Sequence, residues 1–424
     1  MTDSARELDA RPADPAERVR AGLARRTEAN TVFFEAEAER TARLCHRMAE
    51  RFARDGRLVA LGASPAARSD ARHVAVEFVH PVIVGKRALP AIGLAPEGGP
   101  LSLQARLLLE PEDVVIAFGP GEGDAGETEA ALATAREKGC LTIAYAESAP
   151  AEWAFGIPSE DPFVRQEVAE THYHILWELV HVFFEHRGLL EGRQARQVHD
   201  PGDSRFLYPF LGEEETDLDA VLRDVEESVR MKAEDVGDLR RQTLTEGTGA
   251  LVAAAEEIRR RFEAGGTMLA FGNGGSATDA MDVVADFVQP PRDWPSRPAV
   301  DLTADPAILT AIANDVGTDA VFSRQVIAYG RAGDVALALS TSGNSRNVIE
   351  ALAEARRREL LTVAFVGYDG GRVAAERLAD HVIVTRSEHI PRIQEAQASA
   401  YHVLRELVEA VPSSTNTTSF GSAD

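Results

Sequence analysis

The chain has 424 residues, of which 44% are hydrophobic and 27% charged, and its formal net charge is −23. This length accommodates two domains of ordinary size. The negative charge argues against nucleic acid and anionic membranes as partners, because neither would meet a basic surface. The two cysteines, Cys45 and Cys140, form no CxxC pair, so neither a thiolate zinc site nor a redox motif is expected. One disulfide between them stays open.

Membrane and export signals are not expected from the sequence. No apolar run approaches the ~18 residues that a transmembrane helix needs, and the polar start of the chain lacks the apolar core of a signal peptide. We therefore expect a cytoplasmic protein.

The first half of the chain alternates helical and strand patterns. After a loose polar tail over residues 1–16, helical periodicity is found over 17–55 and 163–187, and a further helix is expected over 126–138. Strand patterns occupy 57–61, 91–94, 114–118 and 141–145, and a helix follows the first of them to about Phe78. This alternation predicts a parallel sheet covered by helices on both faces.

The second half repeats that organisation after a break. Residues 191–216 contain turn formers and an acidic run and are expected to be a linker. Helical patterns cover 218–264, a second α/β unit follows, and a last helix is expected over 392–409. We predict domains at 17–190 and 217–411, with a disordered Ser- and Thr-rich tail over 412–424.

Two loops of the second half have the composition of anion-binding turns. The apolar run 267–271 leads into Gly272-Asn273-Gly274-Gly275-Ser276 and then a helix, and the run 335–339 leads into Ser340-Thr341-Ser342-Gly343-Asn344-Ser345 and another helix. Free N–H groups and the helix dipole at such a turn attract anions, and hydroxyl groups add donors. Each loop alone is also compatible with an ordinary tight turn or helix cap. Two of them in one α/β unit favour a phosphorylated small molecule.

Together with three further motifs, these loops resemble a known family. Asn314-Asp315, Arg392-Ile393-Gln394-Glu395 and His402 follow in the order found in sugar isomerase (SIS) domains, and more narrowly in phosphoheptose isomerases. The resemblance covers roughly residues 213–410. That family interconverts sedoheptulose 7-phosphate and a glycero-manno-heptose 7-phosphate. The resemblance implies these substrate and phosphate ligands: Asn273, Gly274, Gly275, Ser276, Asp315, Ser340, Thr341, Ser342, Ser345 and Gln394.

An internal repeat extends the resemblance to the first half. Residues 57–62 match 267–272, residues 76–81 match 285–290, and residues 113–118 match 334–339. Gln166-Glu167 and Tyr173-His174 match Gln394-Glu395 and Tyr401-His402 at the same separation. Four matches in the same order indicate a duplicated domain. We therefore predict an α/β protein of two tandem SIS domains, each a parallel sheet flanked by helices in a Rossmann-like three-layer sandwich.

The first copy has lost its phosphate loops. Gly62-Ala63-Ser64-Pro65 stands in place of the Gly-rich loop, and residues 119–124, with sequence GPGEGD, stand in place of the Ser-rich loop. Proline removes a backbone donor, and acidic side chains repel phosphate. The first copy is therefore not expected to hold the substrate phosphate.

The resemblance also implies a zinc site, or a site for another divalent metal. The family takes a His and a Glu from the first helix and a Gln and a His from the last. In the first copy these positions hold His73, Glu77, Gln166 and His174. The second copy has Asp282, Asp286, Gln394 and His402 there, a second possible set that would select zinc less strongly. A surface His–Glu pair in the first copy, and no metal in the second, are the plainer interpretations.

Several functional alternatives follow. The expected activity is aldose–ketose isomerisation of a phosphosugar through an enediol(ate), with Glu77 and His174, or Asp286 and His402, as acid and base. The site is either a composite of both halves or self-contained in the second half. A non-catalytic phosphosugar sensor or scaffold and an isomerase for a different sugar phosphate are alternatives. Because the long helices exceed what one α/β layer needs, we also expect a homo-oligomer, a dimer that mimics a tetramer.

Overall fold

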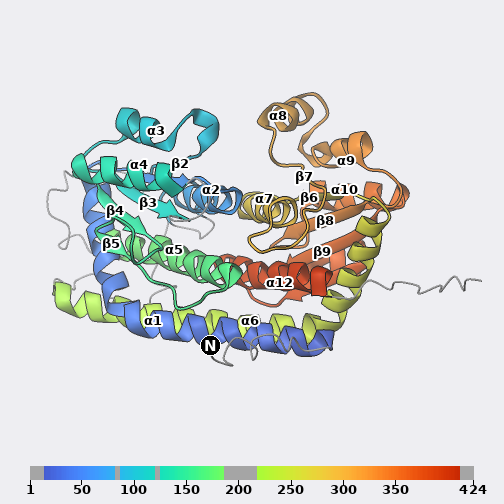
Figure 1. Ribbon diagram of the computed structural model, residues 1–424, viewed down its shortest axis with the longest axis horizontal. Helices are drawn as coiled ribbons and strands as arrows, with labels where there is room; N and C mark the ends of the chain where they lie inside the picture. Colours follow the sequence, from blue (N-terminus) through green and yellow to red (C-terminus); the bar gives the residue numbers. More distant parts are fainter. Residues whose placement is uncertain (1–13, 82–85, 120–124, 186–216, 411–424) are drawn as a thin grey trace, which may run out of the picture.

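Two five-stranded parallel sheets, each flanked by helices, make up the molecule (Figure 1). The computed structural model describes residues 14–81, 86–119, 125–185 and 217–410. The strand order is β2-β1-β3-β4-β5 in the first sheet and β10-β9-β8-β6-β7 in the second. From its opposite edge the second sheet reads β7-β6-β8-β9-β10, which is the order of the first. The two halves thus share one topology, as the internal repeat predicts.

The described residues of the first half form the five strands of the first sheet and five helices longer than a single turn. Its elements are α1 (Pro15–Ala53), β1 (Leu58–Gly62), α2 (Pro65–Val79), β2 (Ala91–Leu94), α3 (Leu101–Leu108), β3 (Val114–Phe118), α4 (Ala125–Glu137), β4 (Leu141–Ala144), β5 (Trp153–Ala154) and α5 (Pro162–Glu185). β1 and β3 are buried along their whole length, which explains their uninterrupted apolar sequence.

The second half follows the same plan with additional helices. Its elements are α6 (Leu218–Glu263), β6 (Met268–Phe271), α7 (Gly275–Val288), β7 (Ala299–Asp301), α8 (Pro306–Asp315), α9 (Ser323–Tyr329), β8 (Val335–Ser340), α10 (Arg346–Arg357), β9 (Leu361–Gly367), α11 (Gly371–Ala375), β10 (His381–Thr385) and α12 (Ile390–Ala410). β6 pairs with β7 on one side and β8 on the other. The chain therefore reverses direction across the sheet at β6, where ligands of open α/β sheets bind.

The long helices α1 and α6 belong to both halves and lie side by side beneath the sheets in Figure 1. Val19 of α1 is part of the second core, whereas Phe33 lies in the first. In α6, Val225 lies in the first core and Leu251 in the second. The apolar faces that led us to expect self-association thus join the two halves of one chain, so they are no longer an argument for an oligomer.

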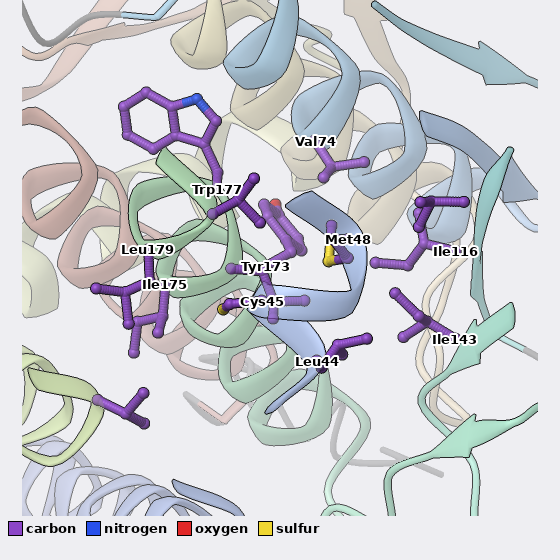
Figure 2. Close-up of a cluster of buried hydrophobic side chains, with 14 of the residues drawn as sticks. Leu44, Cys45, Met48, Val74, Ile116, Ile143, Tyr173, Ile175, Trp177 and Leu179 are labelled. Atoms are coloured by element: carbon purple, nitrogen blue, oxygen red, sulfur yellow. The ribbon is translucent and has the colours of Figure 1, made fainter. Parts of the chain in front are cut away.

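The core of the first half fills the space between α1, α5 and the sheet (Figure 2). Leu44 and Met48 of α1 lie between the strand residues Ile116 and Ile143 and helix α5, and Ile175 of α5 points away from the sheet. Cys45, also in this core, and Cys140 are both buried free thiols. The disulfide that the sequence left open is therefore absent.

Most expected elements begin and end within three residues of the observed ones. One difference lies at the start of α1, inside the expected tail: the helix begins at Pro15, because Asp14 Oδ1 accepts a hydrogen bond from Ala16 N. The expected linker and the expected C-terminal tail lie outside the described residues. Within the described parts of the chain, no helix is both long and apolar enough to span a membrane.

Candidate active site

Four helices meet between the two sheets. α2 packs against α7, and α5 packs against α12, so each contact joins the first half to the second (Figure 1). All candidate metal ligands lie on these helices. The buried side chains there form two clusters, one of His73, Glu170 and His174 and the other of Asp282, Asp286 and His402. Each cluster is contacted by a glutamine from the other half.

The first cluster is centred on two facing histidines. His73 Nε2 on α2 lies 3.4 Å from His174 Nε2 on α5, and 3.1 Å from the amide Nε2 of Gln394 on α12. Glu77 Oε1, one turn along α2, lies 3.9 Å from His73 Nε2. Ligand atoms around a tetrahedral zinc ion are about 3.3–3.5 Å apart, given bonds of about 2.0–2.2 Å. Since the O and N of an amide are distinguished only by their partners, Gln394 can present its oxygen, which has no hydrogen-bond partner.

Burial controls protonation in the first cluster. It raises the pKa of Glu77 to about 8, with Glu178 and Glu395 adding repulsion. Burial lowers the pKa of His174 to about 3, and it also lowers that of His73 well below its usual value. Both imidazoles are therefore neutral at pH 7, which is the form that binds a metal ion.

Two acidic residues near His73 were not identified from the sequence. Glu170 Oε1 and Asp279 Oδ1 lie 3.9 and 3.8 Å from His73 Nδ1, and both residues are buried. Burial raises the pKa of each carboxyl well above its usual value. Neither oxygen is within hydrogen-bond distance of the ring, but Glu170 forms with His73 and His174 a group that could hold a metal ion. Glu170 lies four residues, or one helical turn, before His174 on α5. This spacing, like that of His73 and Glu77, could have identified Glu170 from the sequence as a neighbour of His174.

The second cluster contains Asp282 and Asp286 of α7 and His402 of α12. His402 Nε2 lies 3.3 Å from Asp282 Oδ2 and 3.4 Å from Asp286 Oδ2. Gln166 of α5 donates its amide N–H to Asp282 Oδ1 at 2.9 Å. Although burial alone would favour a neutral imidazole, the hydrogen bonds to Asp282 and Glu167 raise the pKa of His402 to about 10.

The two glutamines are exchanged relative to the sets expected from the sequence. Gln394, assigned to the second-half set, lies beside His73, and Gln166, assigned to the first-half set, lies beside Asp282. The cause is the packing of α5 against α12, whose N-terminal turns each reach the cluster of the other half. An alignment of the repeats pairs equivalent positions, but it contains no information on which half they face.

Each last-helix histidine is oriented by a glutamate from the other half. His174 Nδ1 lies 2.9 Å from Glu395 Oε1, and His402 Nδ1 lies 2.9 Å from Glu167 Oε1. A carboxylate on one ring nitrogen leaves the other nitrogen facing the cluster. These positioning residues were visible in the sequence as the repeated Gln-Glu pair, but they were not assigned a role.

The Gly-rich loop of the second half packs directly onto the first cluster. Gly274 has φ 57° and α7 begins without a side-chain cap, while the N–H groups of Ala277 and Thr278 already donate to Gly274 O. The N–H groups of Gly275 and Ser276 are therefore the ones left for a ligand. A Cβ atom at Gly275 would lie 1.8 Å from Gln394 Nε2 and 2.9 Å from His73 Nε2. Only glycine allows this approach. Ser276 is buried in the same turn.

The Ser-rich loop lies at the neighbouring strand end. α10 also begins without a side-chain cap, while Ser340 Oγ accepts a hydrogen bond from Gly343 N and lies 3.5 Å from Ser345 Oγ. Thr341 and Ser342 are partly exposed. The side chains of Asn273 and Asn347 exchange two hydrogen bonds, of 2.9 and 2.8 Å, and so connect the Gly-rich loop to α10. The two uncapped helix starts therefore face one region.

The corresponding helix start in the first half is closed. Ser64 Oγ accepts a hydrogen bond from Ala67 N, and Pro65 is the first residue of α2. These two residues remove donors that a phosphate would need. Most of the second degenerate loop, residues 120–124, lies outside the described residues.

Asp315 is not joined to these loops. It is exposed at the end of α8, where its Oδ1 accepts a hydrogen bond from Asn314. Among the described residues, no recorded contact connects it to either loop or to the first cluster.

Comparison with known proteins places the chain in a family. A SIS domain model matches residues 233–367. The phosphoheptose isomerase of Thermodesulfovibrio yellowstonii is 40% identical over 44% of this chain and 93% of its own length. That of Chlorobium phaeobacteroides is 46% identical over 40% of this chain and 76% of its own length. The chain belongs to the phosphoheptose isomerase family.

Two solved structures match the fold over nearly the whole chain, including both halves. The C-terminal domain of glucosamine-fructose-6-phosphate aminotransferase from Francisella tularensis covers 92% of the chain and 94% of its own length, with TM-score 0.56 and 11% identity. Tagatose-6-phosphate ketose/aldose isomerase from Escherichia coli covers 94% and 95%, with TM-score 0.55 and 14% identity. At such low identity these likenesses show the fold alone: two SIS domains in one chain.

The region matched by the SIS model includes both phosphate loops but neither His73 nor His174. The first cluster has to be understood from the geometry of this chain.

Proposed function

We propose that this phosphoheptose isomerase family member converts sedoheptulose 7-phosphate to a glycero-manno-heptose 7-phosphate at a single composite active site. The second half would bind the phosphate, and the first half would supply most of the groups at the reacting carbons. The observation that carries this proposal is the contact of Gly275 with Gln394 and His73, which joins the loop to the first cluster.

The geometry favours the composite site over one contained in the second half. Gly275 and Asp286 are eleven residues apart on α7, which separates them by about 16 Å at about 1.5 Å per residue. Asp286 and His402 are thus remote from the uncapped helix start, whereas His73 touches it. We accordingly propose Glu77 and His174, rather than Asp286 and His402, as the residues of the reaction.

The phosphate would be held by neutral donors. Ser276 and the N–H groups at the start of α7 form one side, and Ser340, Thr341, Ser342 and Ser345 with the start of α10 form the other. We propose Asn273 as the residue that keeps the two loops together. Asp315 remains a proposed sugar ligand, but α8 would have to move towards the two loops for its side chain to reach the substrate.

The donor set of the first cluster fits a zinc ion. His73, His174 and Gln394 would be its three protein ligands, and a fourth position would remain open, as in catalytic zinc sites. The partnerless oxygen of Gln394 and the two neutral imidazoles that face one another support this assignment. The ion, when bound, would supply Lewis-acid polarisation of the substrate oxygens.

Glu77 is the proposed proton carrier. In the direction from ketose to aldose it would take a proton from C1 and return it to C2. Between these two transfers a C1=C2 enediol(ate) forms, O2 gains a proton and O1 loses one, so the isomerisation balances without a co-reactant. The Oε2 atom of Glu77 has no hydrogen-bond partner. Burial raises the pKa of this carboxyl to about 8, within the range in which a side chain can both accept and release a proton near neutral pH.

The experiment that tests this function is NMR of sedoheptulose 7-phosphate incubated with the protein, with and without zinc. A new heptose 7-phosphate signal that depends on metal is the expected result. Broadening of the phosphate resonance without conversion would instead favour a phosphosugar sensor. Conversion of a different ketose phosphate alone would move the assignment to another sugar.

The oligomeric state remains a separate proposal. We propose that two chains associate into a dimer, and light scattering at micromolar concentration measures this directly. A mass of 45.8 kDa, that of one chain, would remove the proposal.

A further inference from the structure

Two side chains of α5 and two of α12 form a closed ring of contacts behind the first cluster. His174 Nδ1 lies 2.9 Å from Glu395 Oε1. Arg392 donates from Nη1 to the same oxygen at 2.7 Å, and from Nη2 to Glu178 Oε1 at 2.7 Å. Glu178 follows His174 by four residues on α5, and Glu395 follows Arg392 by three on α12, so each helix contributes two neighbouring side chains. The ring therefore joins the last helix of one half to the last helix of the other.

The members of this α5–α12 ring are shielded from water. The exposed fraction is 0% for His174 and Glu395, 5% for Glu178 and 6% for Arg392. Lys232 of α6 contacts the other oxygen of Glu178 and is 20% exposed, so it closes the ring towards the surface. Two carboxyl groups thus face two cations, which is the compensation that buried ion pairs need. Because solvent is excluded, water cannot readily replace a contact that a substitution removes.

The contact between Glu395 and His174 bears on which ring nitrogen carries the proton. Arginine has only donors, so Glu395 accepts from Arg392, and its Oε1 is shared with His174 Nδ1. When Nδ1 carries the proton and donates it to Oε1, Nε2 keeps its lone pair. This Nε2 lies 3.4 Å from His73 Nε2, on the side where the zinc ion is proposed to bind. A carboxylate on the far nitrogen fixes the tautomer and the orientation of a metal-binding histidine.

The second cluster lacks such a ring between the last helices. Glu167 Oε1 lies 2.9 Å from His402 Nδ1, but its arginine partner, Arg26, comes from α1. The position of α5 that matches Arg392 in the internal repeat holds Val164. The ring is therefore a property of the first cluster, the one that packs against the Gly-rich loop.

We propose that Arg392 and Glu178 are positioning residues of the composite site, which act through Glu395 to hold His174 with its proton on Nδ1 and with Nε2 facing His73. Glu178 anchors the guanidinium of Arg392, and Arg392 places the carboxyl group of Glu395. The inference rests on the proposed function for the role of His174 as a zinc ligand. The state of the imidazole itself does not require the ion.

The first test is NMR of the imidazole nitrogens in the metal-free, full-length protein labelled with ¹⁵N-histidine. Loss of signals in His174→Gln assigns those of His174. In the wild type they should show a single tautomer, with the proton on Nδ1. Arg392→Met keeps an unbranched side chain but has no donors, and it should show a mixture of the two tautomers.

The second test is the Kd of zinc, measured by competition with a chelator. Arg392→Met should raise it by about 10–100-fold, the usual effect of losing an outer partner of a metal ligand. Arg26→Met is the matched control, because it removes the buried arginine beside the second cluster. It should leave both the zinc Kd and the His174 signals as in the wild type. Melting temperatures identify any variant that does not fold.

A wild-type pattern of His174 signals in Arg392→Met would overturn the inference. If that variant does not fold, Glu178→Gln decides in the same way, since it removes the anchor of the guanidinium. An equal change in Arg26→Met would also overturn it, because the effect would then be general.

The outcome is separable from that of the proposed function, because the NMR signals are recorded without zinc or substrate. Signals that depend on Arg392 in a protein that does not convert sedoheptulose 7-phosphate would reject the function and support the ring. Conversion at the wild-type rate by Arg392→Met, with unchanged signals, would do the opposite.

Discussion

Gln394 Nε2 lies 3.1 Å from His73 Nε2, although the two residues are 321 positions apart in the chain. The contact unites the last helix of the second half with the first α/β helix of the first. It is also the contact that Gly275 packs against, so it connects the metal-type ligands to the phosphate loop.

The two histidine clusters should differ in their importance for catalysis. We expect His174→Ala to lower kcat at least 100-fold, because it removes a proposed metal ligand from the composite site. His402→Ala should lower kcat by less than 10-fold. Initial rates with sedoheptulose 7-phosphate measure both. The reverse order would show that the site is contained in the second half.

The glycine at the loop tests the contact itself. Gly275→Ala places a methyl group 1.8 Å from Gln394 Nε2 and should displace that side chain, lowering kcat and zinc retention at least 10-fold. Gly249→Ala is the matched control, since a Cβ there meets nothing within 4 Å on helix α6. It should stabilise the helix by about 0.5–1 kcal/mol and leave turnover near that of the wild type. Equal activity of the two variants would contradict the proposed geometry.

Two equivalent serines should have separable roles. Ser276→Ala removes a proposed phosphate donor and should raise KM roughly 10-fold, as expected for one hydrogen bond to a charged group. Ser64→Ala in the other copy removes the cap of α2 and should cost about 1 kcal/mol of unfolding free energy without a change in KM. Steady-state kinetics and urea unfolding distinguish the two effects. An increase in KM for Ser64→Ala would indicate that the first half binds the substrate phosphate, which would contradict the proposal.

Acid should destabilise the protein through two groups of buried ion pairs. Although burial opposes its charge, Arg26 lowers the pKa of Glu167 to about 2. Lys232 and Arg392 likewise hold the pKa of Glu178 far below its usual range. Since both pKa values are depressed in the folded state, their stabilisation is complete above the unfolded pKa near 4.5 and is lost as pH falls towards 2. Urea unfolding should show a falling free energy over this window.

A substitution at Glu178 tests whether these ion pairs cause the loss of stability in acid. Glu178→Gln should reduce the slope of the acid limb and cost roughly 3–5 kcal/mol at pH 7, because Arg392 loses one of its two buried carboxylate partners, the other being Glu395. Glu376→Gln, in an exposed pair with Arg372, should leave the acid limb as it is in the wild type. An unaltered slope in Glu178→Gln would show that acid unfolding begins elsewhere.

Most of the fold and the two loops proposed to bind phosphate could be predicted from local patterns in the sequence. The apolar runs before Gly272 and Ser340, the helical periods and the repeated Gln-Glu pair lie within short stretches of sequence, and they predicted two SIS domains. The order of the strands was not predicted from the sequence, and it is the same in both sheets.

Only the tertiary structure decided which residues meet. Gln166 and Gln394 exchange places because α5 packs against α12, and Glu170, Asp279, Glu167 and Glu395 enter the clusters through the same contacts. The apolar faces of the long helices α1 and α6 suggested a partner chain. In the structure these faces are covered by the two halves of the same chain. Periodicity identifies which face of a helix is buried, but the identity of the surface that covers it depends on contacts between residues hundreds of positions apart.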